Sequence, residues 1–236
     1  MKHTGIVIAL LPEATCLTPS PVVNNIIELT DRISMYISGM GSERITKGVQ
    51  VLLDSGVDSL ISFGTAGALQ PDFIPGVVVV PKKIIGRDME TYDMTADWHA
   101  RVMKNLADAP MSIHTGNLVH SDSVLSTSKD KSLLHNKCGA VAVDMESAVI
   151  AAMAIGKGVP VLAIRAVVDD AAMSIAGSVL NHSDIYGNMN IAGLLFSLLK
   201  HPGDIPDFIR LVKGFRSASA NLSWLGRHLE KILLSI

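Results

Sequence analysis

Short apolar runs rich in β-branched residues alternate with segments of helical period, and this alternation limits the fold more than any other feature of the chain. The runs that we predict as buried strands are residues 5–11, 33–38, 59–63, 77–80 and 161–168. The segments that we predict as helices are residues 43–53, 98–106, 146–155 and 185–200. Buried strands that alternate with helices favour a largely parallel, twisted sheet covered on both faces. We therefore expect an α/β fold with three layers, α/β/α.

The length of 236 residues, 48% of them hydrophobic, fits one α/β domain, so we expect residues 1–236 to form a single domain. A helical C-terminal extension, about residues 200–236, is punctuated by prolines and glycine. Within it Arg210, Lys213 and Arg216 form a basic stripe on one helix side. Such a stripe is either a solvated face of helices that pack on the core or on a second subunit, or a contact with a membrane surface.

Charge and cysteine content limit the classes of partner. The formal net charge is −2, so no overall basic field would hold nucleic acid. Cys16 and Cys138 fit no metal site or disulfide framework, which favours a reducing compartment. The apolar run near the N-terminus is short and lacks a cleavage site, and no apolar stretch approaches the ~20 residues of a spanning helix. We expect a cytoplasmic protein without a metal or another cofactor.

The residues that follow the predicted strands carry most of the reactive side chains. Ligands of an open parallel sheet bind beyond the carboxyl ends of the strands. Glu13 follows the first strand, the small residues Thr65, Ala66 and Gly67 follow the third, and Asp169 follows the last. A carboxylate directly after a buried strand is costly unless it is paired, solvated or used in chemistry. The glycine-rich turn alone is a weak signal, because such turns are commonly structural.

The segment 143–148, with sequence VDMESA, places Asp144 where a helix cap is expected and Glu146 in the first helical turn. The positive end of a helix favours an ionised carboxylate there. Capping is a sufficient explanation for Asp144. It does not explain the pair of Met145 and Glu146.

Five motifs occur in the order and at about the spacing of the purine nucleoside phosphorylase and nucleosidase superfamily, which the chain resembles over nearly its whole length. They are ALLPE at 9–13, GMG at 39–41, GTAGAL at 64–69, VDME at 143–146 and RAVVD at 165–169. Within the superfamily the chain most resembles the hopanoid-associated nucleosidases, also called phosphorylases. That resemblance is carried by SFGTAGALQP at 62–71, DMESA at 144–148, RAVVD and KHPGD at 200–204. It implies a nucleoside phosphorylase-like fold.

The resemblance also implies roles for the candidate residues. Asp169 would hydrogen-bond or protonate N7 of the purine, so that adenine leaves as a neutral group. Glu146 would bind the ribose hydroxyls with Met145 packed beneath the sugar, and Glu13 would orient or deprotonate the attacking water. Thr65, Ala66 and Gly67 would line the site, and the backbone around Val124 and Leu125 would hold the edge of the base. Without such roles, Asp169 is explained as a helix cap and Glu13 as a solvated charge at a strand end.

Departures from the family pattern bear on the reaction and on the substrate. Phosphorylases hold phosphate partly through an arginine three residues before the position of Thr65, and here that residue is Ser62. A glutamate after the first strand would repel phosphate and suits water, so hydrolysis is favoured. Methylthioadenosine nucleosidases carry serine before the catalytic aspartate and an aromatic residue at the position of Val124, whereas this chain has Val168 and Val124. The substrate is therefore expected to lack a small thioether tail.

The expected reaction is hydrolysis of an adenine nucleoside with release of adenine, and the resemblance implies adenosylhopane as substrate and ribosylhopane as product, in hopanoid biosynthesis. Three alternatives stay open: a phosphate-dependent phosphorylase, a methylthioadenosine/S-adenosylhomocysteine nucleosidase, and a non-catalytic nucleoside-binding module on the same fold. We further expect a homodimer, no nucleic acid partner, and peripheral contact with the inner face of the membrane if the basic tail binds lipid.

Overall fold

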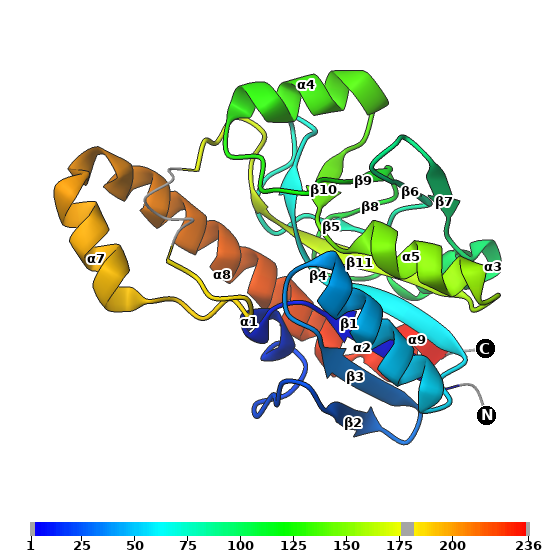
Figure 1. Ribbon diagram of the computed structural model, residues 1–236. Coiled ribbons are helices and arrows are strands. Elements are labelled where there is room, and N and C mark those ends of the chain that lie inside the picture. Colours follow the sequence, from blue (N-terminus) through cyan, green and yellow to red (C-terminus); the bar gives the residue numbers. More distant parts are fainter. Residues whose placement is uncertain (1–2, 176–181, 235–236) are drawn as a thin grey trace.

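A single mixed sheet forms the centre of the protein in the computed structural model, which describes residues 3–175 and 182–234 (Figure 1). The strands are β1 (Thr4–Ile8), β2 (Ile26–Thr30), β3 (Ile33–Ile37), β4 (Ser59–Ala68), β5 (Val78–Val79), β6 (Lys83–Ile85), β7 (Thr91–Asp93), β8 (Ile113–His114), β9 (Leu118–His120), β10 (Ala142–Asp144) and β11 (Val161–Asp169). The helices are α1 (Leu11–Ala14), α2 (Ser42–Asp54), α3 (Ala96–Asn105), α4 (Ser128–Cys138), α5 (Ser147–Gly156), α7 (Ile191–Lys200), α8 (Ile205–Arg227) and α9 (Leu229–Leu234), with a 3₁₀ turn η1 (Pro202–Asp204).

The long strand β4 organises the sheet. The strands follow the order β2-β3-β1-β4-β10-β9-β6-β7, and β11 pairs with β4 and with β5, which in turn pairs with β8. Strands β3, β1, β4 and β11 run parallel, whereas β10 is antiparallel to the C-terminal part of β4. The carboxyl ends of β1 and β11 therefore face the same edge of the sheet as the second half of β4, and β10 joins them there.

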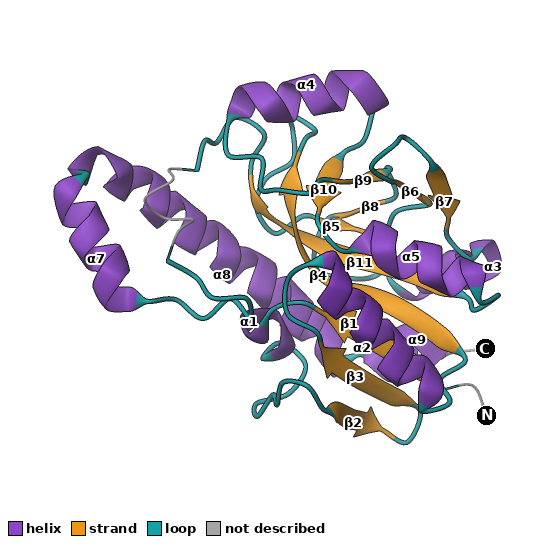
Figure 2. Cartoon of the chain, viewed as in Figure 1, coloured by secondary structure: helices purple, strands orange, loops and turns teal. Residues whose placement is uncertain are grey.

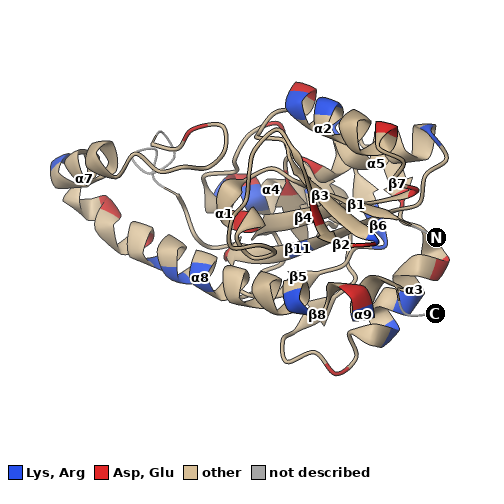
Figure 3. Cartoon of the chain, turned by 90° about the horizontal axis from the view of Figure 1, so that it is seen from below, with Lys and Arg blue, Asp and Glu red and all other residues tan. Residues whose placement is uncertain are grey.

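Helices cover both faces of the sheet, which gives the three predicted layers (Figure 2). Helices α2 and α5 pack against each other and against β1, β3, β4 and β11 on one face. Helix α8 crosses β11 on the other face, where α3 and α9 also pack together. The view from below separates α2 and α5 from α8, α9 and α3, with the strands between them (Figure 3). The predicted α/β/α architecture is confirmed.

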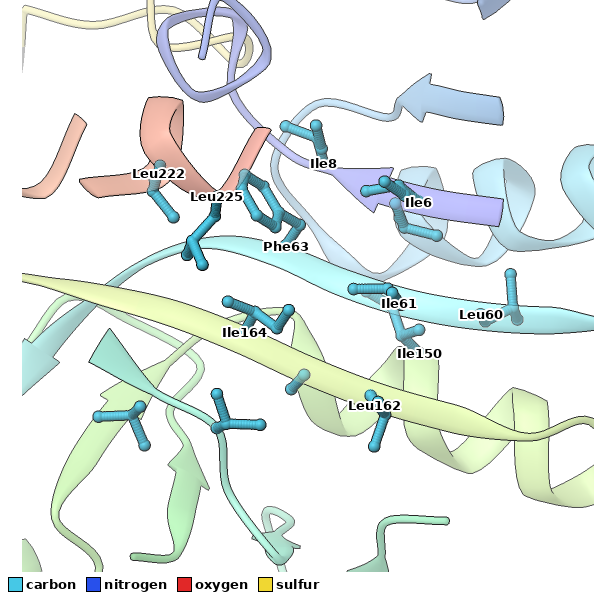
Figure 4. Close-up of a cluster of buried hydrophobic side chains, with 14 of the residues drawn as sticks. Ile6, Ile8, Leu60, Ile61, Phe63, Ile150, Leu162, Ile164, Leu222 and Leu225 are labelled. Carbon is cyan, nitrogen blue, oxygen red and sulfur yellow. The ribbon is translucent and has the colours of Figure 1, made fainter. Parts of the chain in front are cut away.

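The core explains why the apolar runs form strands. Phe63, Ile164 and Leu162 of β4 and β11 point into the layers between sheet and helices, where they meet Ile150 of α5 and Leu225 of α8 (Figure 4). These side chains are almost completely excluded from water. A strand buried on both faces needs apolar residues at nearly every position, and this requirement produces the continuous runs seen in the sequence.

Three predicted boundaries are wrong. The strand expected at 5–11 ends at Ile8, and Leu11 already begins the short helix α1, which has Pro12 in its first turn. The strand expected at 59–63 continues to Ala68, because the small residues Gly64, Thr65, Ala66 and Gly67 keep pairing with β11. The helix expected at 185–200 begins only at Ile191, where the side chain of Asn190 accepts a hydrogen bond from the N–H of Gly193 as its cap. Before it, the N–H of Gly187 bonds to the carbonyl of Asp184 in a turn that helical periodicity does not reveal.

The C-terminal region is helical, and part of it projects from the body of the protein (Figure 1). The second half of α8 buries Leu222 and Leu225, whereas α7 leaves several large apolar side chains in solvent. They are Ile191, Leu195, Phe196 and Leu199, with exposed fractions of 66%, 56%, 60% and 80%. Within residues 3–175 and 182–234, no helix is long and apolar enough to cross a membrane.

Candidate active site

A pocket lies at the carboxyl ends of β1, β4, β10 and β11, and all nine residues predicted for the site line it. They are Glu13, Thr65, Ala66, Gly67, Val124, Leu125, Met145, Glu146 and Asp169. Leu10, Met40, Lys131, Asp144 and Ile175 also line it. The parallel strands bring together residues that are far apart in the sequence, as expected at the carboxyl edge of an α/β sheet.

Glu13 is buried and held by donors from the strand end. Its Oε1 atom accepts hydrogen bonds from the backbone N–H of Thr65, at 2.8 Å, and from the Thr65 hydroxyl, at 2.7 Å. Its Oε2 atom accepts one from the N–H of Leu10, at 3.2 Å. Burial raises the pKa of Glu13, although Arg165 and the Thr65 donors act in the opposite direction. The carboxyl group is therefore fixed in place and prepared to accept a proton, so the alternative of a solvated charge is wrong.

Arg165 is the centre of a buried polar cluster that we did not predict. Its Nη2 atom lies 2.8 Å from Asp144 Oδ2, and its Nη1 atom lies 3.4 Å from Glu146 Oε2. Its Nη2 group also donates to the hydroxyls of Ser62, at 2.6 Å, and Ser147, at 3.0 Å. A buried guanidinium is tolerated only with such partners. The clue in the sequence is the arginine within the apolar run of β11, which marks a buried partner.

The cluster corrects the interpretation of Asp144 and adds to that of Ser62. Asp144 accepts hydrogen bonds from the N–H of Ser147, at 3.2 and 3.4 Å, and from the Ser147 hydroxyl, and it also pairs with Arg165. The N-cap position of α5 belongs to Glu146 rather than to Asp144. Ser62 is fully buried and faces Arg165 and Ser147, so this position carries no side chain into the pocket.

The environment of Glu146 favours its neutral form. Burial raises its pKa to about 8, with Arg165 lowering it and the charges of Asp144 and Glu13 raising it. Glu146 lies where the chain enters α5, and Met145 beside it lines the pocket. The carboxyl group can thus donate or accept a hydrogen bond near neutral pH.

Asp169 belongs to a second charged cluster of the pocket, which we call the Asp169 end, and the cluster around Arg165 is the Arg165 end. Asp169 lies where β11 shifts register against β4 between Val167 and Asp169. Such an irregularity re-aims a side chain at the end of a strand. Asp169 is buried, and burial raises the pKa of its carboxyl group, with Lys131 lowering it and Asp170 raising it. Its Oδ2 atom accepts a hydrogen bond from the ammonium of Lys131, a residue of α4 that we did not predict. This ion pair in the pocket explains the buried position better than a helix cap does.

Among residues 3–175 and 182–234, no three His, Cys, Asp or Glu side chains are grouped so that they could hold a metal ion. The carboxylates of the pocket instead have cationic partners, Arg165 at one end and Lys131 at the other. This arrangement defines the class: an α/β protein whose strand-end pocket combines buried carboxyl groups of raised pKa with two buried cations.

The family model of the phosphorylase superfamily matches residues 26–199, and the chain belongs to this superfamily. The predicted superfamily is thus confirmed. A purine nucleoside phosphorylase of DeoD type from Streptococcus gordonii is 31% identical over 149 residues, which are 58% of this chain and 63% of that protein. A DeoD-type phosphorylase from Streptococcus thermophilus is 31% identical over 153 residues, 59% of this chain and 69% of that protein. The chain therefore spans only about two thirds of the length of these relatives.

Solved structures show the same fold. The 5′-methylthioadenosine/S-adenosylhomocysteine nucleosidase from Neisseria meningitidis, in complex with methylthio-immucillin-A, has a TM-score of 0.72 at 16% identity, over 100% of both chains. A futalosine hydrolase mutant of Helicobacter pylori has a TM-score of 0.63 at 18% identity, over 71% of this chain and 90% of that one. At such identities the likeness establishes the fold alone.

Proposed function

We propose that the protein hydrolyses the N-glycosidic bond of an adenine nucleoside and releases adenine. The observation that carries this proposal is that the charged groups of the pocket form two clusters with different partners. Glu13 and Glu146 interact with Arg165 in one cluster, and Asp169 pairs with Lys131 in the other. Nucleosidases and nucleoside phosphorylases among the similar proteins support a nucleoside as the ligand.

In this proposal the base lies at the Asp169 end and the sugar at the Arg165 end. Asp169 gives its proton to N7 of the purine as the bond to the sugar breaks, and its raised pKa supports this role. Glu146 binds the ribose hydroxyls above Met145. Glu13 holds the attacking water and takes a proton from it. Glu146 in its neutral form can still donate or accept hydrogen bonds to the ribose, and Glu13 in its ionised form stabilises the positive charge that develops on the sugar.

The charge at the sugar end favours water over phosphate. The guanidinium of Arg165 interacts electrostatically with three carboxyl groups, those of Glu13, Asp144 and Glu146. Arg165 is already occupied by Asp144, Glu146 and two hydroxyls, so it has no free face for a phosphate ion. A phosphate dianion at this end would be repelled by the charge of Asp144, and by Glu13 and Glu146 whenever they are ionised. A phosphorylase is the alternative that this arrangement disfavours.

The experiment is product analysis with adenosine, inosine, methylthioadenosine and S-adenosylhomocysteine, first in phosphate-free buffer and then after addition of phosphate. We expect free adenine from the adenine nucleosides without phosphate. No release of base under either condition, combined with binding of the nucleoside, would favour the non-catalytic module instead.

We further propose that the 5′ carbon of the substrate bears a large apolar group, with adenosylhopane as the specific candidate. Support comes from the region beside the pocket. Ile175 lines the pocket and packs with Leu194 and Leu198 of α7, and the opposite side of α7 leaves Phe196 and Leu199 in solvent. Helix α7 thus packs beside the pocket on one side and presents an exposed apolar surface on the other, and large surfaces of this kind mark sites of interaction.

In the same proposal, the projecting helices contact the inner face of the membrane. Arg210, Lys213 and Arg216 are exposed on α8, whose basic residues form a band in Figure 3. Apolar and cationic side chains on neighbouring helices give reversible, salt-sensitive binding to anionic lipid.

Two measurements test the lipid-linked substrate. Turnover of adenosylhopane should exceed that of methylthioadenosine, S-adenosylhomocysteine and inosine, and a strong preference for a small soluble nucleoside would reject the hopanoid assignment. Flotation with anionic liposomes should weaken in Phe196→Gln/Leu199→Gln and stay unchanged in Leu133→Gln, a control for an exposed apolar residue on α4. Equal flotation of all three proteins would remove the role of α7. Truncation near Lys200 is less suitable, because it removes the buried side chains of α8.

The homodimer and the cytoplasmic location stay predictions. Light scattering coupled to size exclusion tests the first, and fractionation of cells that express the protein tests the second.

A further inference from the structure

Lys131 is a lysine whose side chain is almost completely buried, although it belongs to a polar helix at the surface. Only 1% of it is exposed, and its helix α4 contains charged and polar residues at most positions. Its ammonium group has three acceptors: Asp169 Oδ2, the carbonyl of Asp170 at 2.8 Å, and the carbonyl of Met173 at 3.1 Å. An ammonium has three N–H donors, and each has a partner here.

Burial of an ammonium group is costly, so this contact needs an explanation beyond the packing of α4. A lysine on a solvated helix would ordinarily keep its charge in water. Here Lys131 instead joins α4 to the end of β11 and to the loop that follows it. The start of α4 is also held, because the N–H of Asp130 donates to the side chain of Thr127. The helix therefore presents the ammonium to the pocket in a fixed position.

We propose that Lys131 is a positioning residue that acts through Asp169. Its ammonium group stabilises the Asp169 carboxylate that proton donation leaves behind, and this lowers the barrier to donation. This inference rests on the proposed function. During the reaction the proton passes from Asp169 to the purine nitrogen, and the electron pair of the broken N–C bond goes to the base. Lys131 takes no part in this proton transfer. The anion formed on Asp169 is buried, and the ammonium already lies against it.

The other groups near Asp169 do not replace Lys131. Asp170, next in the chain, carries a like charge, and the exposed Arg210 of α8 contacts Asp170, at 3.4 Å, rather than Asp169. On the neighbouring strand β4, Asp169 pairs with Gly67, which brings no charge. Lys131 is therefore the cation in contact with the proposed acid. Without it, the charge of Asp170 repels the Asp169 carboxylate and no contacting cation offsets that repulsion.

The test compares Lys131→Met, which removes the charge, with Lys131→Arg, which keeps it. We expect kcat of Lys131→Met to fall by about 10²-fold, the usual effect of losing one donor to a developing anion. The protonated form of Asp169 should also persist to higher pH, so the alkaline limb of the pH profile should move up by about 1–3 units. Lys131→Arg should leave the limb where it is in the wild-type protein. If Lys131→Met does not fold, Lys131→Gln replaces it, and we expect the same fall in kcat and the same shift of the alkaline limb.

A second readout does not depend on turnover. The carboxyl carbon of Asp169 is followed by NMR in protein with labelled aspartate, and its signal is assigned by its loss in Asp169→Asn. We expect the titration midpoint of this signal to be higher in Lys131→Met than in the wild-type protein. Equal midpoints in the two proteins would overturn the proposal. If no nucleoside is cleaved, the proposed function fails, and the NMR titration still decides whether Lys131 controls Asp169.

Discussion

The two buried cations of the pocket, Arg165 and Lys131, come from different parts of the fold. Arg165 extends from a central strand and has a set of partners from β4, β10 and α5. Lys131 reaches in from the covering helix α4 and binds one carboxylate and two loop carbonyls. The sugar end of the pocket is thus built into the sheet, whereas the base end depends on a helix and a loop. Substitutions at the two ends should therefore differ in their effects on activity and on stability.

The largest expected effect is on activity at the base end. Asp169→Asn removes the proton that the departing base needs, so turnover should fall by ~10²–10⁴-fold while the fold stays intact. Asp72→Asn is the control, because Asp72 is an exposed aspartate that does not line the pocket. Steady-state kinetics with adenosine and circular dichroism of both variants check this. More than about a tenth of the wild-type rate in Asp169→Asn would exclude the general acid, whose loss is expected to cost at least ~10²-fold.

At the sugar end the largest effect should be on stability. Arg165→Met leaves Asp144 and Glu146 buried without their cation, and breaking a buried pair in this way costs about 3–5 kcal/mol. Lys131→Met should cost less, because Asp169, freed of one partner, can take up a proton. Urea denaturation of the two variants gives the comparison. A larger loss in Lys131→Met than in Arg165→Met would contradict the division between the two ends.

Gly64 offers a steric test of the sugar end. A methyl group at Gly64 would lie 2.6 Å from Arg165 Nη1 and 2.7 Å from Glu13 Oε1, whereas one at Gly156 meets nothing within 4 Å. Gly64→Ala should therefore destabilise the protein by about 1–3 kcal/mol and reduce turnover, and Gly156→Ala should do neither. Thermal unfolding and kinetics of both variants measure the difference, and equal behaviour of the two would show that Arg165 and Glu13 can move aside.

Glu146 should also make the stability of the protein depend on pH, gradually over several pH units. The pKa of Glu146 is raised from 4.5 to about 8 in the folded protein, so the folded state binds this proton more tightly than the unfolded state. The stability from Glu146 is then complete below pH 4.5 and is lost as pH rises toward about 8, with a slope of at most about 1.4 kcal/mol per pH unit. Glu146→Gln should flatten this decline in urea denaturation across that range. The same slope in both proteins would mean that Glu146 is not the group responsible.

The sequence predicted those parts of the fold and site that depend on local pattern. Apolar strands and the carboxylates after them are visible in one dimension, so Glu13 and Asp169 could be identified from their positions. Local pattern explains Asp144 only as a cap, because its partner Arg165 is 21 residues away and reaches it through the pairing of strands. Lys131 had no signal at all, since a lysine in a polar helix is normally solvated. Both depend on tertiary contacts that periodicity does not encode.

The most direct test of the claim that the carboxyl groups around Arg165 exclude phosphate is to identify the nucleophile from the reaction products. Cleavage of the nucleoside is followed by ³¹P NMR in the presence of inorganic phosphate, and adenine is measured by chromatography in the same samples. We expect adenine to accumulate at the rate seen without phosphate, with inorganic phosphate as the sole phosphorus signal. A sugar 1-phosphate that grows in step with adenine, together with no release in phosphate-free buffer, would contradict the assignment of the sugar end to water.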